Sequence, residues 1–269
     1  MPSPSRRRVA AGSPPSDRGG NTVEVIPRQR PLDPPAILFA GGGARGHAEE
    51  NSIEAFHLAR RLGATGIESD LHVTADGVPL LRRSPKVGGL RKRRVRDVDA
   101  ADLPDDVVTM PSFYESIGND LELLVHLRDV DAVEPAIALA TRHRSLDRLW
   151  LAAADRSTLR SIRQRSSIVR LVSTTVAADM VDGVERHAAR MREDRIDAIL
   201  LPRSDWTGGR TALFHRFGRR CFATDAPHER MIAVMLHIGV DGVVSGYPDR
   251  MTDAAAAAAR PDAPELLDE

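Results

Sequence analysis

The sequence predicts one (β/α)8 barrel of the α/β class. Short apolar segments alternate along the chain with amphipathic segments, which is typical of parallel strands joined by crossover helices. The chain has 269 residues, of which 42% are hydrophobic, so it can bury one substantial core. Eight such units in roughly 220 residues fit a closed barrel better than the alternative, an open doubly wound sheet.

The expected strands are short runs of aliphatic residues, and eight can be placed. They span residues 36–40, 65–73, 122–128, 148–153, 168–173, 198–201, 220–223 and 242–245. Amphipathic helices are expected between them, at 52–62, 130–142, 157–164, 181–192, 211–217 and 228–238. Several follow a Ser, Thr or Asp at a position that suits an N-cap, as a series of βα units requires.

The ends of the chain differ in composition from its centre. Residues 1–30 are rich in Arg, Pro and Ser and carry too little apolar surface to fold, so we expect a disordered tail. The barrel domain is expected over residues 31–252. Residues 253–269 then form the end of a helix and an acidic tail.

Composition excludes several classes of function. Lys plus Arg and Asp plus Glu both number 38, so no global field attracts nucleic acid, and the aromatic residues are too dispersed to stack bases. No apolar run approaches the ~20 residues that cross a bilayer, and the N-terminus lacks a signal sequence. The single cysteine, Cys221, fits a reducing compartment. We therefore expect a cytoplasmic protein with no transmembrane segment, and its oligomeric state stays open.

Several ordered motifs resemble those of the glycerophosphodiester phosphodiesterase family. They read AGGGARGHAEENSIEAF at 40–56, GIESDLHVTADGVPLLRRSP at 66–85, VHLRD at 125–129 and GVDGVVSGYPDR at 239–250. The resemblance implies a TIM barrel of the PLC-like phosphodiesterase type and a role in lipid metabolism. It also implies the family reaction, the metal-dependent hydrolysis of glycerophosphodiesters to glycerol 3-phosphate and an alcohol.

The resemblance fails at the catalytic histidines. The His-Arg pair of the family's first motif corresponds to Gly41 and Gly42, and the His-Asp pair of the second corresponds to Arg83 and Ser84. Glycine has no proton-transfer group, and arginine stays protonated, so neither replaces imidazole. Because acid and base groups each contribute about 10²- to 10⁴-fold, we expect hydrolysis at least roughly 10⁴-fold slower, or none. The alternative is an active phosphoric diester hydrolase with a rearranged acid and base, drawn from His47, His72 or His126.

The metal site implied by the resemblance is partly kept. Glu68 and Asp70 occupy the two ligand positions of the ExD motif, and alternation along a strand points both side chains to one side. The third ligand, a Glu in the family, is His126. The family metal is Ca or Mg, whereas imidazole moves the preference toward Zn, Mn, Fe or Ni. The alternative is a site with no metal, in which Arg83 pairs with the two carboxylates.

Anion recognition is better preserved. Arg128 stands where the family has a phosphate-contacting Lys, and Arg83 and Glu50 are further candidates for contact with a small phosphodiester ligand. Glu50 and Asn51 can also cap the first helix. Gly41 to Gly43 fit either an anion nest or a tight turn. A cationic run follows the second strand, either a solvated loop or a surface for an anionic lipid or a partner, and it comprises Arg82, Arg83, Lys86, Arg91, Lys92, Arg93, Arg94 and Arg96.

Overall fold

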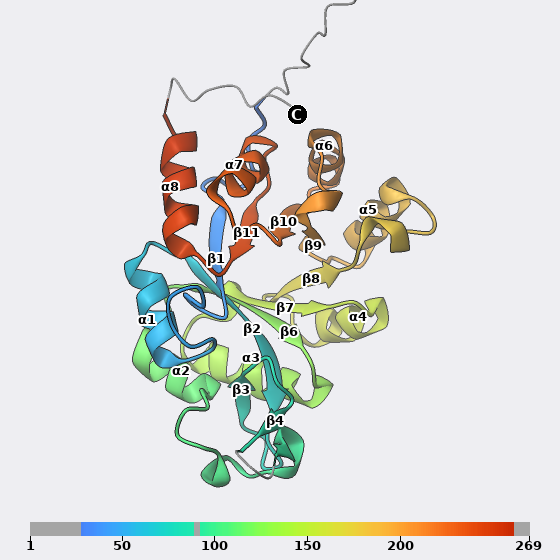
Figure 1. The fold of residues 1–269 in the computed structure, drawn as a ribbon. Coiled ribbons are helices and arrows are strands. Elements are labelled where there is room, and N and C mark those ends of the chain that lie inside the picture. The colour runs from blue at the N-terminus through green and yellow to red at the C-terminus, as the bar shows by residue number, and fades with distance from the viewer. Residues whose placement is uncertain (1–27, 89–91, 261–269) are drawn as a thin grey trace, which may run out of the picture.

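The computed structural model describes residues 28–88 and 92–260 and forms a closed barrel of eight parallel strands (Figure 1). The strands are β1 (Ile37–Gly41), β2 (Gly66–Val73), β6 (Glu122–Leu127), β7 (Leu149–Ala153), β8 (Arg170–Thr174), β9 (Ala198–Pro202), β10 (Arg220–Thr224) and β11 (Gly242–Ser245). Strand β1 pairs with both β11 and β2, which closes the sheet. The predicted (β/α)8 barrel is confirmed, and the open sheet was the wrong alternative.

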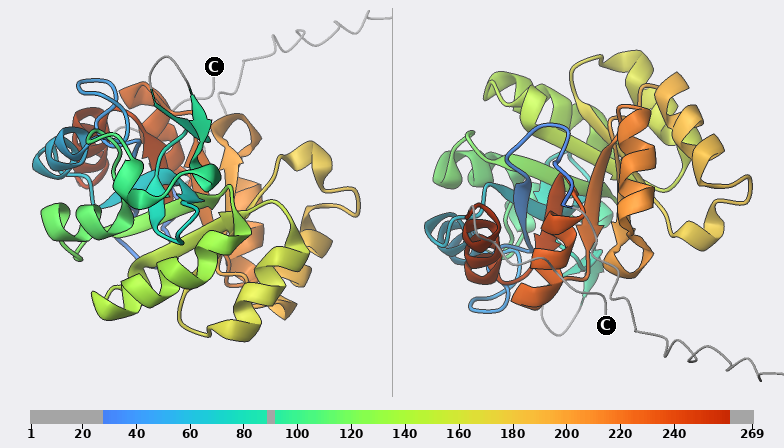
Figure 2. Two further views of the ribbon diagram at one scale, coloured as in Figure 1. Left: turned by 90° about the horizontal axis from the view of Figure 1, so that it is seen from below. Right: turned by 90° about the horizontal axis from the view of Figure 1, so that it is seen from above.

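Each barrel strand is followed by a helix on the outside of the barrel (Figures 1 and 2). The helices are α1 (Ile53–Arg61), α2 (Met110–Ile117), α3 (Val133–Arg142), α4 (Arg156–Arg165), α5 (Val184–Glu193), α6 (Gly208–Arg216), α7 (Glu229–His237) and α8 (Pro248–Ala258). Short 3-10 helices fill several connections, at Val95–Asp97, Ala100–Asp102, Val130–Ala132, Leu146–Arg148, Ala177–Asp179 and Arg203–Asp205. The largest apolar cluster packs between the strands and these helices.

The connection between β2 and α2 contains strands that the sequence pattern did not predict. Strand β3 (Pro79–Leu81) pairs antiparallel with the end of β2, and β4 (Lys86–Val87) pairs antiparallel with β5 (Arg93–Arg94). This segment projects at the bottom of Figure 1 and faces the viewer in the left view of Figure 2. Strands of two or three residues are too short to show a period in the sequence, which is why they were missed.

Register decides which side chains line the barrel. Gly41 is opposite Glu68, and Asp70 is opposite His126. The apolar interior is formed by residues of the same alternation, including Phe39 and Leu124. Glu68, Asp70 and His126 therefore point inward from the carboxyl ends of β2 and β6, above the apolar filling.

The loop after β1 is fixed by local polar contacts. The N-cap of α1 is Ser52, whose hydroxyl accepts the Ala55 N–H, so the expected capping by Glu50 and Asn51 was wrong. Asn51 instead adopts a φ of 60° and its Oδ1 accepts the Ser69 hydroxyl from β2 at 2.6 Å. This buried contact ties the loop to the neighbouring strand, on which the candidate ligands lie.

A polar cluster joins α6, β10 and β11 at the opposite end of the barrel. The Asp241 carboxylate accepts the N–H groups of Leu32 and Cys221 and lies 2.8 Å from Nε2 of His215. Ligand atoms of His215, Cys221 and Asp241 lie within 4.8 Å of one another, a spacing that a metal can bridge. Because the carboxylate already has three partners and burial raises the pKa of the Cys221 thiol, we interpret this cluster as a structural clamp.

Among the helices that the structure describes, none combines the length and the apolar character that a bilayer-spanning segment needs. Residues 1–27, 89–91 and 261–269 lie outside the described chain, so most of the expected N-terminal tail and the acidic end are not tested. The domain boundaries stay a prediction.

The clamp predicts a specific loss of stability. Asp241→Asn should lower the free energy of unfolding by about 1–3 kcal/mol, because the amide cannot accept all three buried donors. Urea denaturation followed by circular dichroism measures this change, with Asp253→Asn on the exposed side of α8 as the control. An equal free energy of unfolding of the two variants would show that the cluster does not stabilise the fold.

Candidate functional site

Glu68 and His126 form a contact at the carboxyl ends of β2 and β6. Nε2 of His126 lies 2.9 Å from Oε1 of Glu68, and the two side chains are 20% and 14% exposed. The partial burial weakens screening by water, so this contact is stronger than a surface pair. The pair provides a carboxylate-oriented imidazole at the barrel mouth.

Asp70 is paired with the guanidinium of Arg128. Nε of Arg128 donates to Oδ1 of Asp70 at 2.6 Å, and the Asp70 side chain is 9% exposed whereas that of Arg128 is 56% exposed. The sequence-based alternative in which Arg83 pairs with Glu68 and Asp70 was therefore wrong. The partners of the two carboxylates come from β6 and the loop that follows it, and β6 pairs parallel with β2.

The predicted ligand set does not fit a hard divalent cation in this arrangement. The cluster of three close His, Cys, Asp or Glu ligand atoms found among the described residues is the structural clamp, not Glu68, Asp70 and His126. Arg128 holds a carboxylate oxygen that a cation would need, and Ca²⁺ and Mg²⁺ prefer oxygen ligands over imidazole. Strand register brings the three residues to one end of the barrel, but their side chains form two separate ion pairs.

The first family histidine position, Gly41, is bordered by Arg45. A Cβ atom added at Gly41 would lie 3.8 Å from the Arg45 guanidinium carbon and 3.1 Å from Oε2 of Glu68. Arg45 also packs across Gly246 and reaches Oε1 of Glu50 at 3.4 Å. The space beside Gly41 is thus bordered by a cation, a residue that the sequence motifs did not single out.

The glycine loop is explained by its backbone. The N–H of Gly42 donates to the Glu68 carbonyl at 2.8 Å, and that of Gly43 donates to the Ala40 carbonyl at 3.1 Å. Both glycines have positive φ, 66° and 79°. These N–H groups are therefore engaged in a tight turn and do not form the anion nest considered from the sequence.

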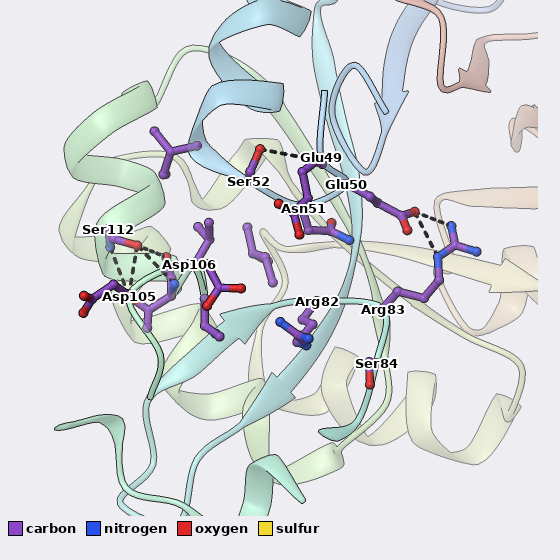
Figure 3. Close-up of a pocket in the computed structure, with 15 residues that line it drawn as sticks. Glu49, Glu50, Asn51, Ser52, Arg82, Arg83, Ser84, Asp105, Asp106 and Ser112 are labelled. Carbon is purple, nitrogen blue, oxygen red and sulfur yellow. Dashed lines mark hydrogen bonds and ion pairs between the residues drawn. The ribbon is translucent and has the colours of Figure 1, made fainter. Parts of the chain in front are cut away.

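The second family histidine position is closed by an ion pair. Nη2 of Arg83 lies 2.8 Å from Oε1 of Glu50, and the two side chains face each other at one end of a pocket of about 660 Å³ (Figure 3). The Ser84 hydroxyl bonds to the backbone of Lys86 and holds a local turn. Neither Arg83 nor Ser84 offers a group that exchanges protons near neutral pH.

The remaining candidate histidines lie apart from the Glu68 contact. His47 is exposed and its Nε2 lies 3.0 Å from Oδ1 of Asp249 in the first turn of α8. His72 is buried on β2, and burial lowers the pKa of its imidazole. Its Nε2 has no hydrogen-bond partner. Of the three candidates, His126 is the one that meets a carboxylate predicted as a ligand.

The sequence motifs did not single out Arg45, because its position beside Gly41 depends on the lack of a side chain at residue 41. The sequence signal was the glycine at 41, which removes an imidazole and leaves room for a neighbouring side chain. Arg82 was noted only as part of the cationic run, yet it lines the same pocket as Arg83 and its buried Nε has no hydrogen-bond partner.

Comparison with known proteins shows which family this chain is similar to. The profile of the Glycerophosphoryl diester phosphodiesterase family matches residues 41–105. The protein named probable glycerophosphodiester phosphodiesterase 2 of Mycobacterium tuberculosis is 26% identical over 233 residues, which cover 77% of this chain and 85% of that protein. This chain is therefore similar to the glycerophosphoryl diester phosphodiesterase family.

Solved structures agree with the fold of this chain. The glycerophosphodiester phosphodiesterase of Thermotoga maritima has a TM-score of 0.71 at 16% identity, covering 81% of this chain and 97% of that one. A phosphodiesterase of Oleispira antarctica, solved in complex with the product sn-glycerol-3-phosphate, has a TM-score of 0.71 at 16% identity. It covers 82% of this chain and 96% of that one.

The two ion pairs predict weak metal binding. We expect titration calorimetry to show no Mg²⁺ or Ca²⁺ site with a Kd below about 1 mM, because Arg128 holds Asp70 and imidazole replaces an oxygen ligand. His126→Glu should tighten binding at least about tenfold, and adding Glu68→Gln should remove that gain. Tight binding by the unmodified protein that Glu68→Gln abolishes would contradict this interpretation.

Proposed function

We propose that this protein binds glycerophosphodiesters or related small phosphate esters at the barrel mouth and hydrolyses them slowly or not at all. The observation that carries the proposal is the residue pair at the family histidine positions, Gly41 and Arg83. Arg83 is further engaged by Glu50, so its guanidinium serves as a fixed charge. Neither residue can deliver or accept a proton during cleavage of a phosphodiester.

Anion binding is supported by Arg128. Its guanidinium has five N–H donors, and one carboxylate oxygen of Asp70 uses Nε, so donors remain for a phosphate. More than half of the side chain is exposed at the mouth. The sn-glycerol-3-phosphate held by the relative from Oleispira antarctica is a ligand of the expected size and charge.

In this proposal the charge of the phosphate is neutralised by side chains. When a divalent metal is bound at the mouth of a family member it polarises the phosphodiester. Here Arg128 supplies a permanent positive charge next to the ExD motif. Binding of Zn, Mn, Fe or Ni by His126 and the carboxylates stays the alternative, and it would require Arg128 to leave Asp70.

A second candidate function is supported by the contact between His126 and Glu68. A carboxylate that hydrogen-bonds one imidazole nitrogen fixes its tautomer and strengthens it as a base. His126 could then activate water or attack phosphorus in a hydrolase with a rearranged site. This candidate lacks a general acid for the leaving alcohol, because Arg83 does not release its proton.

We also propose a cytoplasmic location and a role in lipid metabolism. The buried thiol of Cys221 and the absence of a spanning helix among the described residues are compatible with this location. The domain limits expected from the sequence, with a barrel over 31–252, are part of the same proposal. A purely partner-binding role remains the alternative if no phosphate ester binds.

Binding of sn-glycerol 3-phosphate tests the ligand class. We expect a saturable site by titration calorimetry and at least about tenfold weaker binding in the double variant Asp70→Asn/Arg128→Met, because charge-assisted hydrogen bonds to phosphate are lost. The double change avoids leaving Asp70 as an unpaired charge. Arg142→Met, an exposed cation in the last turn of α3, is the control. No binding by the unmodified protein would refute the proposal.

Turnover tests the loss of catalysis. Hydrolysis of glycerophosphocholine should be absent or at least about 10⁴-fold slower than by the Thermotoga maritima enzyme, because both proton-transfer groups are missing. The choline released is measured in a coupled enzyme assay, in the presence of each of a panel of divalent metals. Turnover within tenfold of that enzyme, abolished by His126→Ala and by Glu68→Gln, would establish the rearranged hydrolase instead.

Restoring the family residues provides the matching gain-of-function control. The variant carries Gly41→His, Gly42→Arg, Arg83→His, Ser84→Asp and His126→Glu. We expect partial recovery at most, because a Cβ at position 42 would lie 2.4 Å from Cγ of Glu50 on a backbone with φ of 66°. Activity is measured in the same choline assay. Full activity would show that the mouth has lost only these side chains.

A further inference from the structure

A second cavity, here called the basic pocket, lies beside the barrel mouth. Its volume is about 600 Å³, which suits a small ligand. It opens between the β4–β5 ribbon and the ends of β2 and β6. Most of its polar lining is cationic, and the lining residues are His72, Val73, Arg83, Pro85, Lys86, Arg94, Val95, Arg96, Arg128 and Asp129.

Three of the five cations that line the basic pocket have no carboxylate partner among the described residues, whereas Arg83 and Arg128 are paired with Glu50 and Asp70. Asp129 is the acidic residue of the lining. Within the described part of the chain, Lys86, Arg94 and Arg96 have no carboxylate within ion-pair distance, whereas Arg93 beside them contacts Asp102. Three unpaired cations around one cavity create a positive local potential, which favours the binding of an anion.

Strand pairing forces two of these cations together. Lys86 and Arg94 are directly opposite each other in the antiparallel β4–β5 ribbon, an arrangement that is destabilising without a counter-ion. The ribbon is held in place by a separate apolar cluster that includes Leu80, Val87 and Val95. The cationic pair is therefore presented by a packed element.

His72, one of the residues that line the basic pocket, has a buried polar atom without a partner. His72 is 7% exposed, its Nε2 makes no hydrogen bond, and the residue lines the cavity. A buried ring nitrogen without a partner costs free energy that a ligand hydrogen bond would recover. This second observation, independent of the charges, also points to a bound polar group.

The basic pocket is continuous with the proposed phosphate site. Arg128 and Arg83 both line it, and Arg128 is the residue that would hold the phosphodiester at the mouth. A ligand bound at Arg128 can therefore extend its alcohol moiety toward Lys86, Arg94 and Arg96. A cationic headgroup such as choline would be repelled there.

We propose that the basic pocket binds a second phosphate group, so that the ligands of this protein are phosphodiesters whose alcohol moiety carries a phosphate monoester. The inference rests on the proposed binding of the diester at Arg128 and specifies the class of ligand. The dianionic monoester would bridge Lys86 and Arg94 and remove their mutual repulsion. Its source is a soluble ester or a lipid headgroup, which share this chemistry.

A matched ligand pair tests the basic pocket. Glycerophosphoinositol 4-phosphate and glycerophosphoinositol differ by one monoester, and titration calorimetry at constant ionic strength gives their affinities. We expect the phosphorylated compound to bind at least about tenfold more tightly. The variant Lys86→Gln/Arg94→Gln/Arg96→Gln should bring this ratio close to one. These side chains are exposed, and thermal unfolding checks that the variant folds.

The control removes the same charge elsewhere. Arg61→Gln/Arg142→Gln/Arg192→Gln lies in the last turns of α1, α3 and α5 and should keep the ratio of the unmodified protein. Equal binding of the two diesters, or a ratio that survives loss of the three pocket cations, overturns the inference.

Two further ligands distinguish failure of the basic-pocket inference from failure of the proposed function. Inositol 4-phosphate carries the monoester but lacks the diester. If it binds to the unmodified protein but not to the pocket variant, the basic pocket is a phosphate site. If glycerophosphoinositol does not bind in the same experiment, the proposed function is wrong. Vesicles of phosphatidylcholine with phosphatidylinositol 4-phosphate test the lipid source. Vesicles in which phosphatidylserine supplies the same charge are the control. Equal binding to both kinds of vesicle, without binding of any soluble compound, would assign the cations to a membrane surface and overturn the inference.

Discussion

The arrangement of side chains at the barrel mouth depends on the partners of two inward-facing carboxylates. Glu68 and Asp70 lie two residues apart on β2, so alternation directs both into the same narrow space. Two partly buried negative charges require a compensating positive charge, from a metal or from the protein. Here His126 and Arg128 contact them from the neighbouring strand and the loop that follows it. The proposed use of side chains to hold phosphate follows from this arrangement.

The other differences from the family pattern are consistent with the same arrangement. Gly41 removes a side chain next to Glu68, and Arg45 borders that space. Arg83 adds a cation that Glu50 holds at a distance from the two carboxylates. The mouth thus lacks the family arginine at Gly42 but gains Arg83, and the basic pocket extends positive charge outward along the β4–β5 ribbon. Such a surface favours multiply charged anions over ligands with cationic headgroups.

The residues that stabilise the fold and the residues proposed to bind ligand lie at opposite ends of the barrel. The clamp formed by His215, Cys221 and Asp241 lies where helices and strands meet at the amino ends of the strands. The candidate ligands and cations lie at the carboxyl ends, where loops can change without disturbing the closed sheet. This separation explains how the mouth can diverge from the family residues while the barrel retains its eight parallel strands.

The sequence determined the barrel and the inward direction of Glu68, Asp70 and His126, because apolar runs mark strands and alternation is a local property of each strand. It also identified the loss of both family histidines. The sequence could not select the ion-pair partners: Arg83 meets Glu50 rather than Asp70, and Ser52 rather than Asn51 caps α1. Contacts between residues far apart in the chain depend on where loops lie. Tertiary structure alone therefore decided the separate ion pairs at the mouth and the unbalanced cations of the basic pocket.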